Sequence, residues 1–344
     1  HKATNSEINE KGECEIHPGR PLEIIKEENY FFKYSAFGNK LLDFYEKNQD
    51  FVVPGFRFNE IKAFVKNGLQ DFSISRLKSK MPWGIEVPGD SEHVMYVWFD
   101  ALINYISTLG WPEDEKNFEK YWINGNPTQY CGKDNTRFQG AMWQAMLMAA
   151  DLPNSHQIVV NGFITGDEGI RMSKTLGNVV DPRDIVNEYG TDALRYFLLR
   201  EVSNFEDSSF TIERFKETYN ANLANGLGNL ASRILTMVEN YAVRSTVINV
   251  KFNDKDLDAF DIKKYMDKIW FKIQELDKII QEKEPYKIFK KNPEEAKNIV
   301  ASLFMQLADV AHSLKPIMPK TSEHILSCLS GHKKPEKPLF LRKE

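Results

Sequence analysis

A loop flanked by glycines carries cations and hydroxyls at a spacing that suits phosphate oxygens. Arg171 and Lys174 lie three residues apart, with Ser173 between them. The loop follows the apolar segment 157–160, and its flanking glycines let the backbone change shape. Guanidinium, ammonium and hydroxyl groups this close together can converge on one phosphate group. An exposed basic turn is the alternative interpretation for such a loop taken alone.

Aromatic residues recur at helical spacing in two segments that each follow a strand-like stretch. The side chains that would converge are Trp98, Ala101, Leu102 and Tyr105 from the first segment and Phe138, Gln139 and Trp143 from the second. Rings contributed by two helices would suit a thioether, because sulfur–aromatic contacts are favourable. Asp134, at the start of the second segment, could accept an ammonium group. Ordinary core packing is the alternative for these aromatic residues.

A polar stripe and an apolar stripe run side by side through a later helical segment. The polar stripe is Asn222, Asn225, Asn229 and Arg233, and the apolar stripe is Leu223, Leu227, Leu230, Ile234 and Met237. Asparagine is a poor helix former, so three on one face predict either hydrogen bonding between helices or a binding surface. Farther on, Pro285 and Tyr286 interrupt a lysine-rich helix. The Tyr286 ring either packs in the core or is available for stacking.

Cys14 and His17 form a C-x-x-H pair, which is the spacing of half a zinc knuckle. Two ligands do not complete the tetrahedral site that zinc needs, so we expect zinc only where two further ligands are supplied. A surface cysteine beside a histidine is the alternative. The chain has three cysteines at spacings that give no disulfide framework, which predicts a cytoplasmic location.

The elements that must position these residues alternate between strand and helix. Helical patterns at 36–47 and 59–66 are followed by strand-like stretches at 93–99, 129–131 and 157–160, with helical patterns at 100–108 and 138–149 between them. This alternation predicts a parallel α/β sheet, and Asp134 is expected to cap the helix that follows it. From about Thr211 onward, amphipathic patterns without strands predict a helical domain.

Composition excludes several classes of protein. With 42% apolar and 27% charged residues, the chain is neither disordered nor collagen-like. No run of about 18 apolar residues occurs, so neither a membrane-spanning helix nor a membrane partner is expected. The net charge is −4, but the region 251–344 carries +4 and the remainder −8. Contact with a nucleic-acid backbone is therefore expected in the C-terminal region.

Several segments resemble one enzyme family. The segment RMSKTLGN (171–178) is similar to the KMSKS motif of class I aminoacyl-tRNA synthetases, with arginine in place of the first lysine and threonine in place of the last serine. Further segments resemble methionyl-tRNA synthetases, in the order found in that family, at 27–46, 96–107, 132–153, 178–201 and 221–234. The resemblance runs from about Cys14 to the end of the chain.

The resemblance implies a role for each group of residues. The loop residues that would contact ATP are Arg171, Met172, Ser173 and Lys174. Lys174, with Arg171, would be catalytic by stabilising the charge that develops on pyrophosphate. The aromatic set and Asp134 would form a methionine pocket, in which Gln139 stands where many relatives have an ionisable histidine. The anticodon would be contacted by Asn225, Asn229, Arg233, Pro285 and Tyr286, with a base stacked on the tyrosine.

The resemblance also implies a fold of α/β plus all-α class in four segments. They are a partial connective insertion (1–92), the second half of a Rossmann-like catalytic domain (93–160), the KMSKS loop with a stem-contact segment (161–209) and an anticodon-binding helical bundle (210–344). None of the seven histidines stands in a His-x-Gly-His arrangement, which is the family's HIGH motif. We therefore expect the first half of the catalytic domain to be absent and the chain alone to be inactive. Removal of that half by proteolysis, its separate encoding and its presence as another chain are the alternatives, and in the last case it would be a partner of this chain.

The implied activity is ATP-dependent activation of L-methionine and its transfer to tRNA(Met), with Mg²⁺ accompanying ATP. Two alternatives remain open. A class I synthetase for another aliphatic amino acid would share the Lys174 loop but lack the set formed by Trp98, Tyr105 and Trp143. A non-catalytic tRNA-binding subunit would bind tRNA without activating an amino acid.

Overall fold

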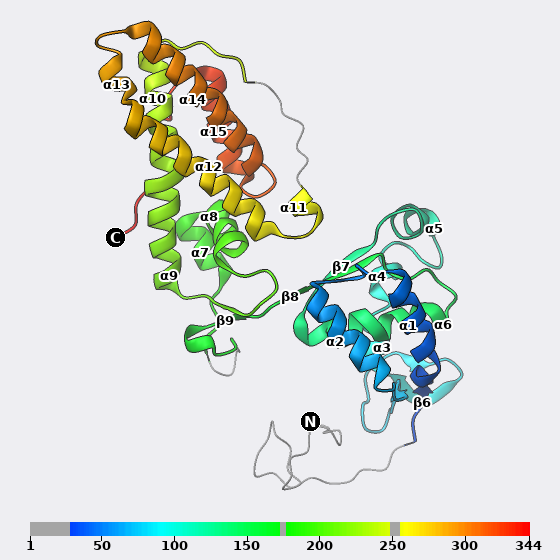
Figure 1. Cartoon of the computed structure of the whole chain (residues 1–344). Coiled ribbons are helices and arrows are strands. Elements are labelled where there is room, and N and C mark those ends of the chain that lie inside the picture. Colours follow the sequence, from blue (N-terminus) through cyan, green and yellow to red (C-terminus); the bar gives the residue numbers. More distant parts are fainter. Residues whose placement is uncertain (1–27, 173–176, 248–254) are drawn as a thin grey trace. The chain divides into compact units, whose positions relative to one another are not determined.

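The computed structural model describes residues 28–172, 177–247 and 255–344, which form two compact units (Figure 1). The first unit contains the described residues up to Phe51, with Asn59–Thr128 and Arg137–Gln157; the second contains Val52–Phe58, Gln129–Thr136 and the described residues from Ile158 to Glu344. The segment boundary expected at 92/93 falls inside a strand of the first unit, and the division into four segments stays a prediction.

The first unit is built mainly from helices. They are α1 (Gly38–Lys47), most of α2 (Gly55–Lys66), α3 (Val97–Ala101), α4 (Asn104–Ser107), α5 (Glu115–Phe118) and α6 (Trp143–Ala149), with a 3-10 turn η2 (Tyr34–Phe37) and π-helical segments η3 (Glu119–Ile123) and η5 (Phe138–Met142). The helices predicted at 36–47, 59–66 and 138–149 are therefore confirmed. The Tyr45 hydroxyl of α1 is buried and donates a hydrogen bond to the Gly140 carbonyl (2.7 Å), which ties α1 to η5.

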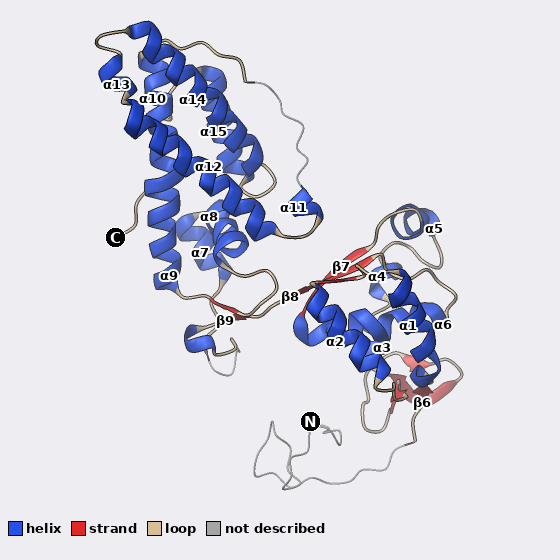
Figure 2. Cartoon of the chain, viewed as in Figure 1, coloured by secondary structure: helices blue, strands red, loops and turns tan. Residues whose placement is uncertain are grey.

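A small antiparallel sheet leads into α3 (Figure 2). Its strand order is β4 (Ser75–Leu77), β6 (Asp90–Met95), β5 (Glu86–Val87), and β1 (Phe31–Phe32) pairs separately with β3 (Phe72–Ser73). The strand predicted over 93–99 is wrong in its second half, because the Tyr96 carbonyl accepts helical hydrogen bonds from the N–H groups of Phe99 and Asp100. A continuous apolar run suits either element, so its periodicity could not locate this change. Trp98 consequently lies within α3.

The second unit contains a three-stranded sheet in the order β2 (Val52–Val53), β8 (Gln157–Asn161), β7 (Thr128–Gly132). β2 runs parallel to β8, and the middle residues of β8 are almost inaccessible, as expected for a strand covered on both faces. The prediction of a parallel sheet is therefore confirmed for the strand at 157–160, which is β8. It is wrong for the strand that begins at 93, because β6 belongs to the antiparallel sheet. A second parallel pair, β9 (Ile164–Thr165) and β10 (Ser208–Ser209), lies beside the loop that follows.

Asp134 does not cap a helix, so that prediction is wrong. It lies inside a 3-10 turn, η4 (Lys133–Asn135), and no side chain caps either η4 or η5. The 3-10 turn runs directly into the helical residues that follow, so Asp134 lies inside the helical stretch rather than before it. Asp134 instead forms an ion pair with Arg171, with 3.2 Å between Oδ2 and Nη2.

The remainder of the second unit is a helical bundle. Its elements are α7 (Pro182–Tyr189), α8 (Thr191–Tyr196), η7 (Phe197–Glu201), α9 (Ile212–Thr218), η8 (Tyr219–Gly228), α10 (Asn229–Asn240), α11 (Lys255–Asp258), α12 (Ile262–Lys283), α13 (Pro285–Ile288), α14 (Pro293–Leu314) and α15 (Pro319–Gly331). From 210 onward the described residues form helices and no strand, as predicted. In Figure 1, α9 and α10 belong to one continuous rod, and its predicted apolar stripe from Leu223 to Met237 is buried in the bundle.

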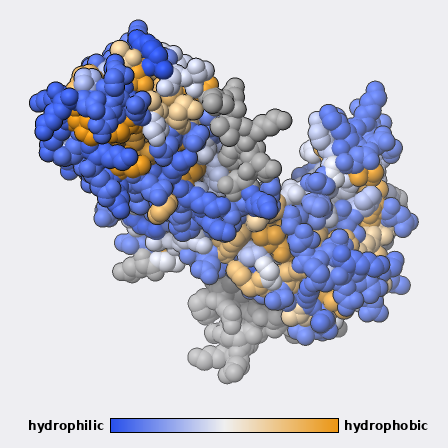
Figure 3. Space-filling view, turned by 45° about the horizontal axis from the view of Figure 1, so that its top comes forward, coloured by the Kyte–Doolittle hydropathy of each residue, from blue (hydrophilic) through white to orange (hydrophobic). Residues whose placement is uncertain are grey.

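The surface of the chain is mainly polar. On the face drawn in Figure 3, hydrophilic residues predominate and hydrophobic residues form smaller patches. Among the described residues, no helix is both long enough and apolar enough to cross a membrane.

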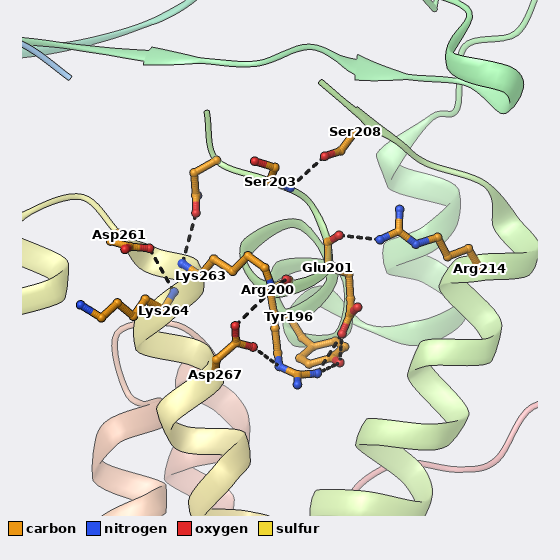
Figure 4. A network of polar contacts seen from close by, with 11 residues as sticks. Tyr196, Arg200, Glu201, Ser203, Ser208, Arg214, Asp261, Lys263, Lys264 and Asp267 are labelled. Atoms are coloured by element: carbon orange, nitrogen blue, oxygen red, sulfur yellow. Dashed lines mark hydrogen bonds and ion pairs between the residues drawn. The ribbon is translucent and has the colours of Figure 1, made fainter. Parts of the chain in front are cut away.

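A network of charged groups joins η7 to the start of α12 (Figure 4). Arg200 forms two ion pairs: its Nη1 lies 2.9 Å from Oε1 of Glu201, and its Nε lies 3.2 Å from Oδ1 of Asp267. Lys263 donates to the Arg200 carbonyl, and the Arg200 guanidinium lies 5.0 Å from the centre of the Trp270 ring. The Arg200 and Glu201 side chains are 17% and 18% exposed, so their charges depend mainly on each other rather than on water.

We predict that Arg200→Met lowers the free energy of unfolding by about 1–3 kcal/mol, because Glu201 would remain largely buried without its cation. Arg183→Met is the control: Arg183 also pairs with a carboxylate, but its side chain is 86% exposed, and a change below about 0.5 kcal/mol is expected. Urea titration followed by circular dichroism measures both. Equal, small effects would show that the network does not stabilise the bundle.

Candidate functional site

Four of the predicted aromatic residues form two ring pairs in the first unit. The Trp98 ring stacks on that of Phe138, with 4.7 Å between centroids and 18° between planes. The Tyr105 and Trp143 rings lie 5.9 Å apart at 49°. Two segments about 40 residues apart are therefore brought together, as the sequence predicts. The two pairs are called the aromatic cluster below.

Polar atoms inside the aromatic cluster lack partners. Nε2 of Gln139 donates to the Tyr105 hydroxyl (2.8 Å). Two buried atoms have no hydrogen-bond partner within the described part of the chain: Oε1 of Gln139, which is an acceptor, and Nε1 of Trp143, which is a donor. An unpaired buried polar group costs about 1–3 kcal/mol. One acceptor and one donor therefore remain unsatisfied here, and a ligand would reach them only after the surrounding side chains move.

The other residues predicted for this pocket have different surroundings. Leu102 is buried in the core, and Ala101 is half-buried at the end of α3. Asp134 belongs to the second unit and pairs there with Arg171. The structure therefore does not test its predicted contact with an ammonium group.

Sequence reasoning missed Trp122, which extends the aromatic cluster. Its ring lies 6.1 Å from that of Trp143 at 77°, and its Nε1 donates to the Pro153 carbonyl (2.9 Å). The i, i+4 spacing of Phe118 and Trp122 was the available signal. Trp143 also lines a cavity of about 220 Å³, whose other lining residues are apolar: Phe32, Phe99, Ile103, Ile106, Trp111, Met146, Leu147, Ala149, Ala150 and Leu152.

The loop of the second unit holds Arg171 between a carboxylate and a ring. Its guanidinium pairs with Asp134 and lies 4.6 Å from the centre of the Phe163 ring. Lys133 lies at the same distance from Phe163 and pairs with Asp207 at 2.6 Å. This hydrogen bond from Lys133 holds the pKa of Asp207 below its usual range. Two cations, one in the loop and one on η4, therefore lie beside the same aromatic side chain.

The remaining loop residues are only partly described. Met172 is half-buried and packs against the core of the helical bundle. Ser173 and Lys174 lie outside the described residues, so their predicted roles in ATP binding and catalysis stay predictions.

Cys131 is excluded as a nucleophile close to this loop. Burial, assisted by the nearby Asp134 carboxylate, raises the pKa of its thiol to about 12. The reactive thiolate is therefore almost absent at neutral pH.

Arg233 and Tyr286 line one groove in the helical bundle, although they lie 53 residues apart in the sequence. The groove has a volume of about 250 Å³ and is lined by Ser232, Arg233, Thr236 and Met237 from α10, Ile280 from α12 and Tyr286 from α13. Tyr286 is 47% exposed, which favours stacking over core packing. Asn225 and Asn229 are exposed at one-turn intervals before Arg233, as the polar stripe predicts.

The backbone at Glu284 sets the position of the Tyr286 ring. Glu284 adopts a left-handed conformation (φ 43°, ψ 56°) between α12 and α13, and Pro285 is buried directly after it. The Tyr286 hydroxyl donates to Oε1 of Glu284 (3.1 Å). The ion pair with Lys287 is the main reason that the pKa of Glu284 lies below its usual range. The carboxylate thus stays ionised and continues to accept the tyrosine hydroxyl at neutral pH.

The metal prediction cannot be placed in the structure. Cys14 and His17 lie outside the described residues. Elsewhere, in the described ranges, no group of three histidine, cysteine or acidic side chains could hold a metal ion.

Comparison with known proteins agrees with this geometry. The family model described as tRNA synthetases class I (M) matches residues 2–235. The chain belongs to this family. The methionine–tRNA ligase of Brucella melitensis is 39% identical over 330 residues, covering 91% of this chain and 63% of the relative. The methionine–tRNA ligase of Caldanaerobacter subterraneus is 39% identical over 331 residues, covering 90% of this chain and 51% of that relative.

Solved structures of the family also match. Mycobacterium tuberculosis methionyl-tRNA synthetase in complex with methionyl-adenylate is 34% identical, with a TM-score of 0.79 over 90% of this chain and 64% of that one. The apo form of the same enzyme gives a TM-score of 0.76 at 31% identity. This synthetase chain thus spans about half to two thirds of the length of these relatives.

We predict that Gln139→Met leaves the free energy of unfolding unchanged or raises it by about 1 kcal/mol, because removal of a buried oxygen without a partner offsets the loss of the hydrogen bond to the half-buried Tyr105 hydroxyl. Gln144→Met is the matched control on the same helix. Its amide bonds Ser155, Asn154 and the Gln139 carbonyl, so a loss of about 2–4 kcal/mol is expected. Urea titration of each variant measures its free energy of unfolding. Equal losses would make Gln139 an ordinary core residue.

Proposed function

We propose that this chain takes part in methionyl-tRNA formation: activation of L-methionine with ATP, followed by transfer of the methionyl group to tRNA(Met). The observation that carries the proposal is that the predicted aromatic residues come together in one cluster and that Arg233 and Tyr286 come together in one groove. The chain is also 36–39% identical to methionine–tRNA ligases. Each group joins segments distant in the sequence. Each also has the chemistry that one substrate needs, the aromatic cluster for methionine and the groove for tRNA.

The aromatic cluster is proposed to bind the methionine side chain. Rings of Trp98, Phe138, Tyr105 and Trp143 offer apolar area and favourable contacts to sulfur. The unpaired Oε1 of Gln139 and Nε1 of Trp143 supply hydrogen-bonding capacity at the same place. A neutral amide at Gln139 does not titrate between pH 5 and 8, so we expect no contribution from this residue to pH dependence.

ATP is proposed to bind the loop that contains Arg171, Met172, Ser173 and Lys174, with Mg²⁺ as part of the nucleotide substrate. The support is the pair of cations, Arg171 and Lys133, that lie beside Phe163, each held by an aspartate whose place a phosphate group could take. Lys174 is proposed to stabilise the charge that develops on pyrophosphate as the methionine carboxylate attacks the α-phosphate. Zinc at Cys14 and His17 belongs to the proposal only where two more ligands complete the site.

The groove and the exposed asparagine face are proposed to bind the anticodon of tRNA(Met). A half-exposed tyrosine ring beside an arginine suits an unpaired base, which can stack on the ring and accept hydrogen bonds from the guanidinium. The residues proposed for this contact are Asn225, Asn229, Arg233, Pro285 and Tyr286.

The methionine assignment predicts that Trp98→Ala weakens methionine binding to the chain roughly tenfold, because the stacked pair with Phe138 is lost. Trp83→Ala is the control, since Trp83 is 72% exposed in the same unit and lies outside the aromatic cluster. Isothermal titration with methionine, and with leucine as competitor, measures both. A wild-type chain that binds leucine as tightly as methionine would instead support a synthetase for another aliphatic amino acid.

The tRNA assignment predicts that Tyr286→Ala weakens binding of tRNA with a CAU anticodon by about tenfold, because stacking of one base is lost. Tyr286→Phe, which keeps the ring, should bind nearly as well as wild type. Tyr121→Ala is the control, since Tyr121 is similarly exposed (51%) but lies in the first unit. Filter binding or fluorescence anisotropy gives the affinities. Equal losses for Tyr286→Ala and Tyr121→Ala would place the anticodon elsewhere.

A further inference from the structure

Asp277 forms an ion pair with Arg233, the charged side chain of the groove. Among the described residues that line the groove, Arg233 alone is charged. Asp277, on α12, accepts a hydrogen bond from Nη1 of Arg233 through Oδ1, and its Oδ2 accepts one from Nε2 of Gln281 one helical turn later. Both carboxylate oxygens are therefore engaged, and the orientation of the carboxylate is fixed from two sides.

This arrangement leaves part of the Arg233 guanidinium for a ligand. A guanidinium has five N–H groups in a planar fork. Within the described chain, Nη1 is held by Asp277, while Nε and Nη2 bond no protein atom. The side chain is 34% exposed and borders the groove that also holds the Tyr286 ring. A base stacked on that ring would meet donors able to bind two acceptors on its edge.

The ion pair also changes what Arg233 attracts. An unpaired arginine draws any phosphate backbone, and that attraction carries no sequence information. Asp277, 37% exposed, offsets this charge and would repel a phosphate placed beside it. The N–H groups of Arg233 keep their directional hydrogen bonding. A paired arginine therefore suits recognition of a base better than attraction of a backbone.

We propose that Asp277 is a positioning residue for anticodon recognition, which fixes the Arg233 guanidinium beside Tyr286 and reduces its attraction for phosphate. The proposal rests on the proposed tRNA function of the groove. Asp277 itself need not touch the RNA. It sets discrimination among anticodons rather than overall affinity.

The test uses the full chain and tRNAs that differ at one anticodon base, at two salt concentrations. Asp277→Asn keeps the shape but removes the charge. We expect the ratio of affinities for CAU and the changed anticodon to fall roughly tenfold, while affinity for both tRNAs is kept or rises. The slope of log affinity against log salt should become steeper by about 0.7–0.9, the value for one added phosphate contact. Asp277→Glu, which keeps the charge, should retain most of the discrimination.

Two controls separate positioning from a structural role. Asp309→Asn removes a similarly exposed carboxylate (46%), which pairs with Lys272 of the same helix α12, and should leave discrimination unchanged. In an Arg233→Ala background, Asp277→Asn should have no further effect on discrimination. A persistent effect there, or equal weakening of all tRNAs without a change in salt slope, would overturn the positioning role. A wild-type chain that does not distinguish the anticodons would instead refute the proposed function.

Discussion

The ion pairs of Arg200 hold the start of α12, one of the longest helices of the second unit, against η7. The guanidinium binds Glu201 within its own segment and Asp267 on α12, and it packs on Trp270 one turn later. Asp267 lies near the start of α12, whereas Ile280 in the groove lies 13 residues farther along, about 20 Å at 1.5 Å per residue. A small rotation at the start of α12 would therefore displace the groove by several ångströms. The geometry of Tyr286 and Arg233 depends on this junction.

The two candidate sites differ in how their polar groups are satisfied. In the aromatic cluster, Gln139 and Trp143 keep buried atoms without protein partners, which reduces stability and leaves hydrogen-bonding capacity for a ligand. In the groove, Asp277 occupies one edge of the Arg233 guanidinium and leaves the other. If the proposed function is right, both arrangements hold the recognising group in place before the ligand arrives. Such preorganisation reduces the entropy that binding must overcome.

Much of this organisation could be predicted from the sequence, because it depends on periodicity. The apolar stripe from Leu223 to Met237 follows helical spacing and is buried as predicted. Trp98 and Phe138 each follow a strand-like stretch in the sequence, and their rings stack as the predicted convergence requires. The exposed position of Tyr286 follows from the break at Glu284 and Pro285.

Other features could not be predicted, because they depend on contacts between distant segments. The run 94–99 is apolar throughout, so only the hydrogen bonds at Tyr96 reveal where the strand becomes a helix. β2 has two residues, too few to show alternation. Asp134 has a suitable position for a helix cap, but it pairs with Arg171 instead. The role of Asp277 depends on a partner 44 residues away on another helix, which no single-helix pattern contains.

Site-specific photocrosslinking tests most directly the claim that α10, α12 and α13 together form an anticodon groove. The photoreactive residue p-benzoylphenylalanine replaces Tyr286 in one sample and Tyr121 in another, and each is irradiated with tRNA carrying a CAU anticodon. Mapping the crosslinked nucleotide should place the position 286 crosslink on an anticodon base, and competition with anticodon-loop RNA should abolish it. Position 121 should give no anticodon crosslink. Crosslinks from position 286 to the acceptor end, or to any RNA alike, would contradict the account.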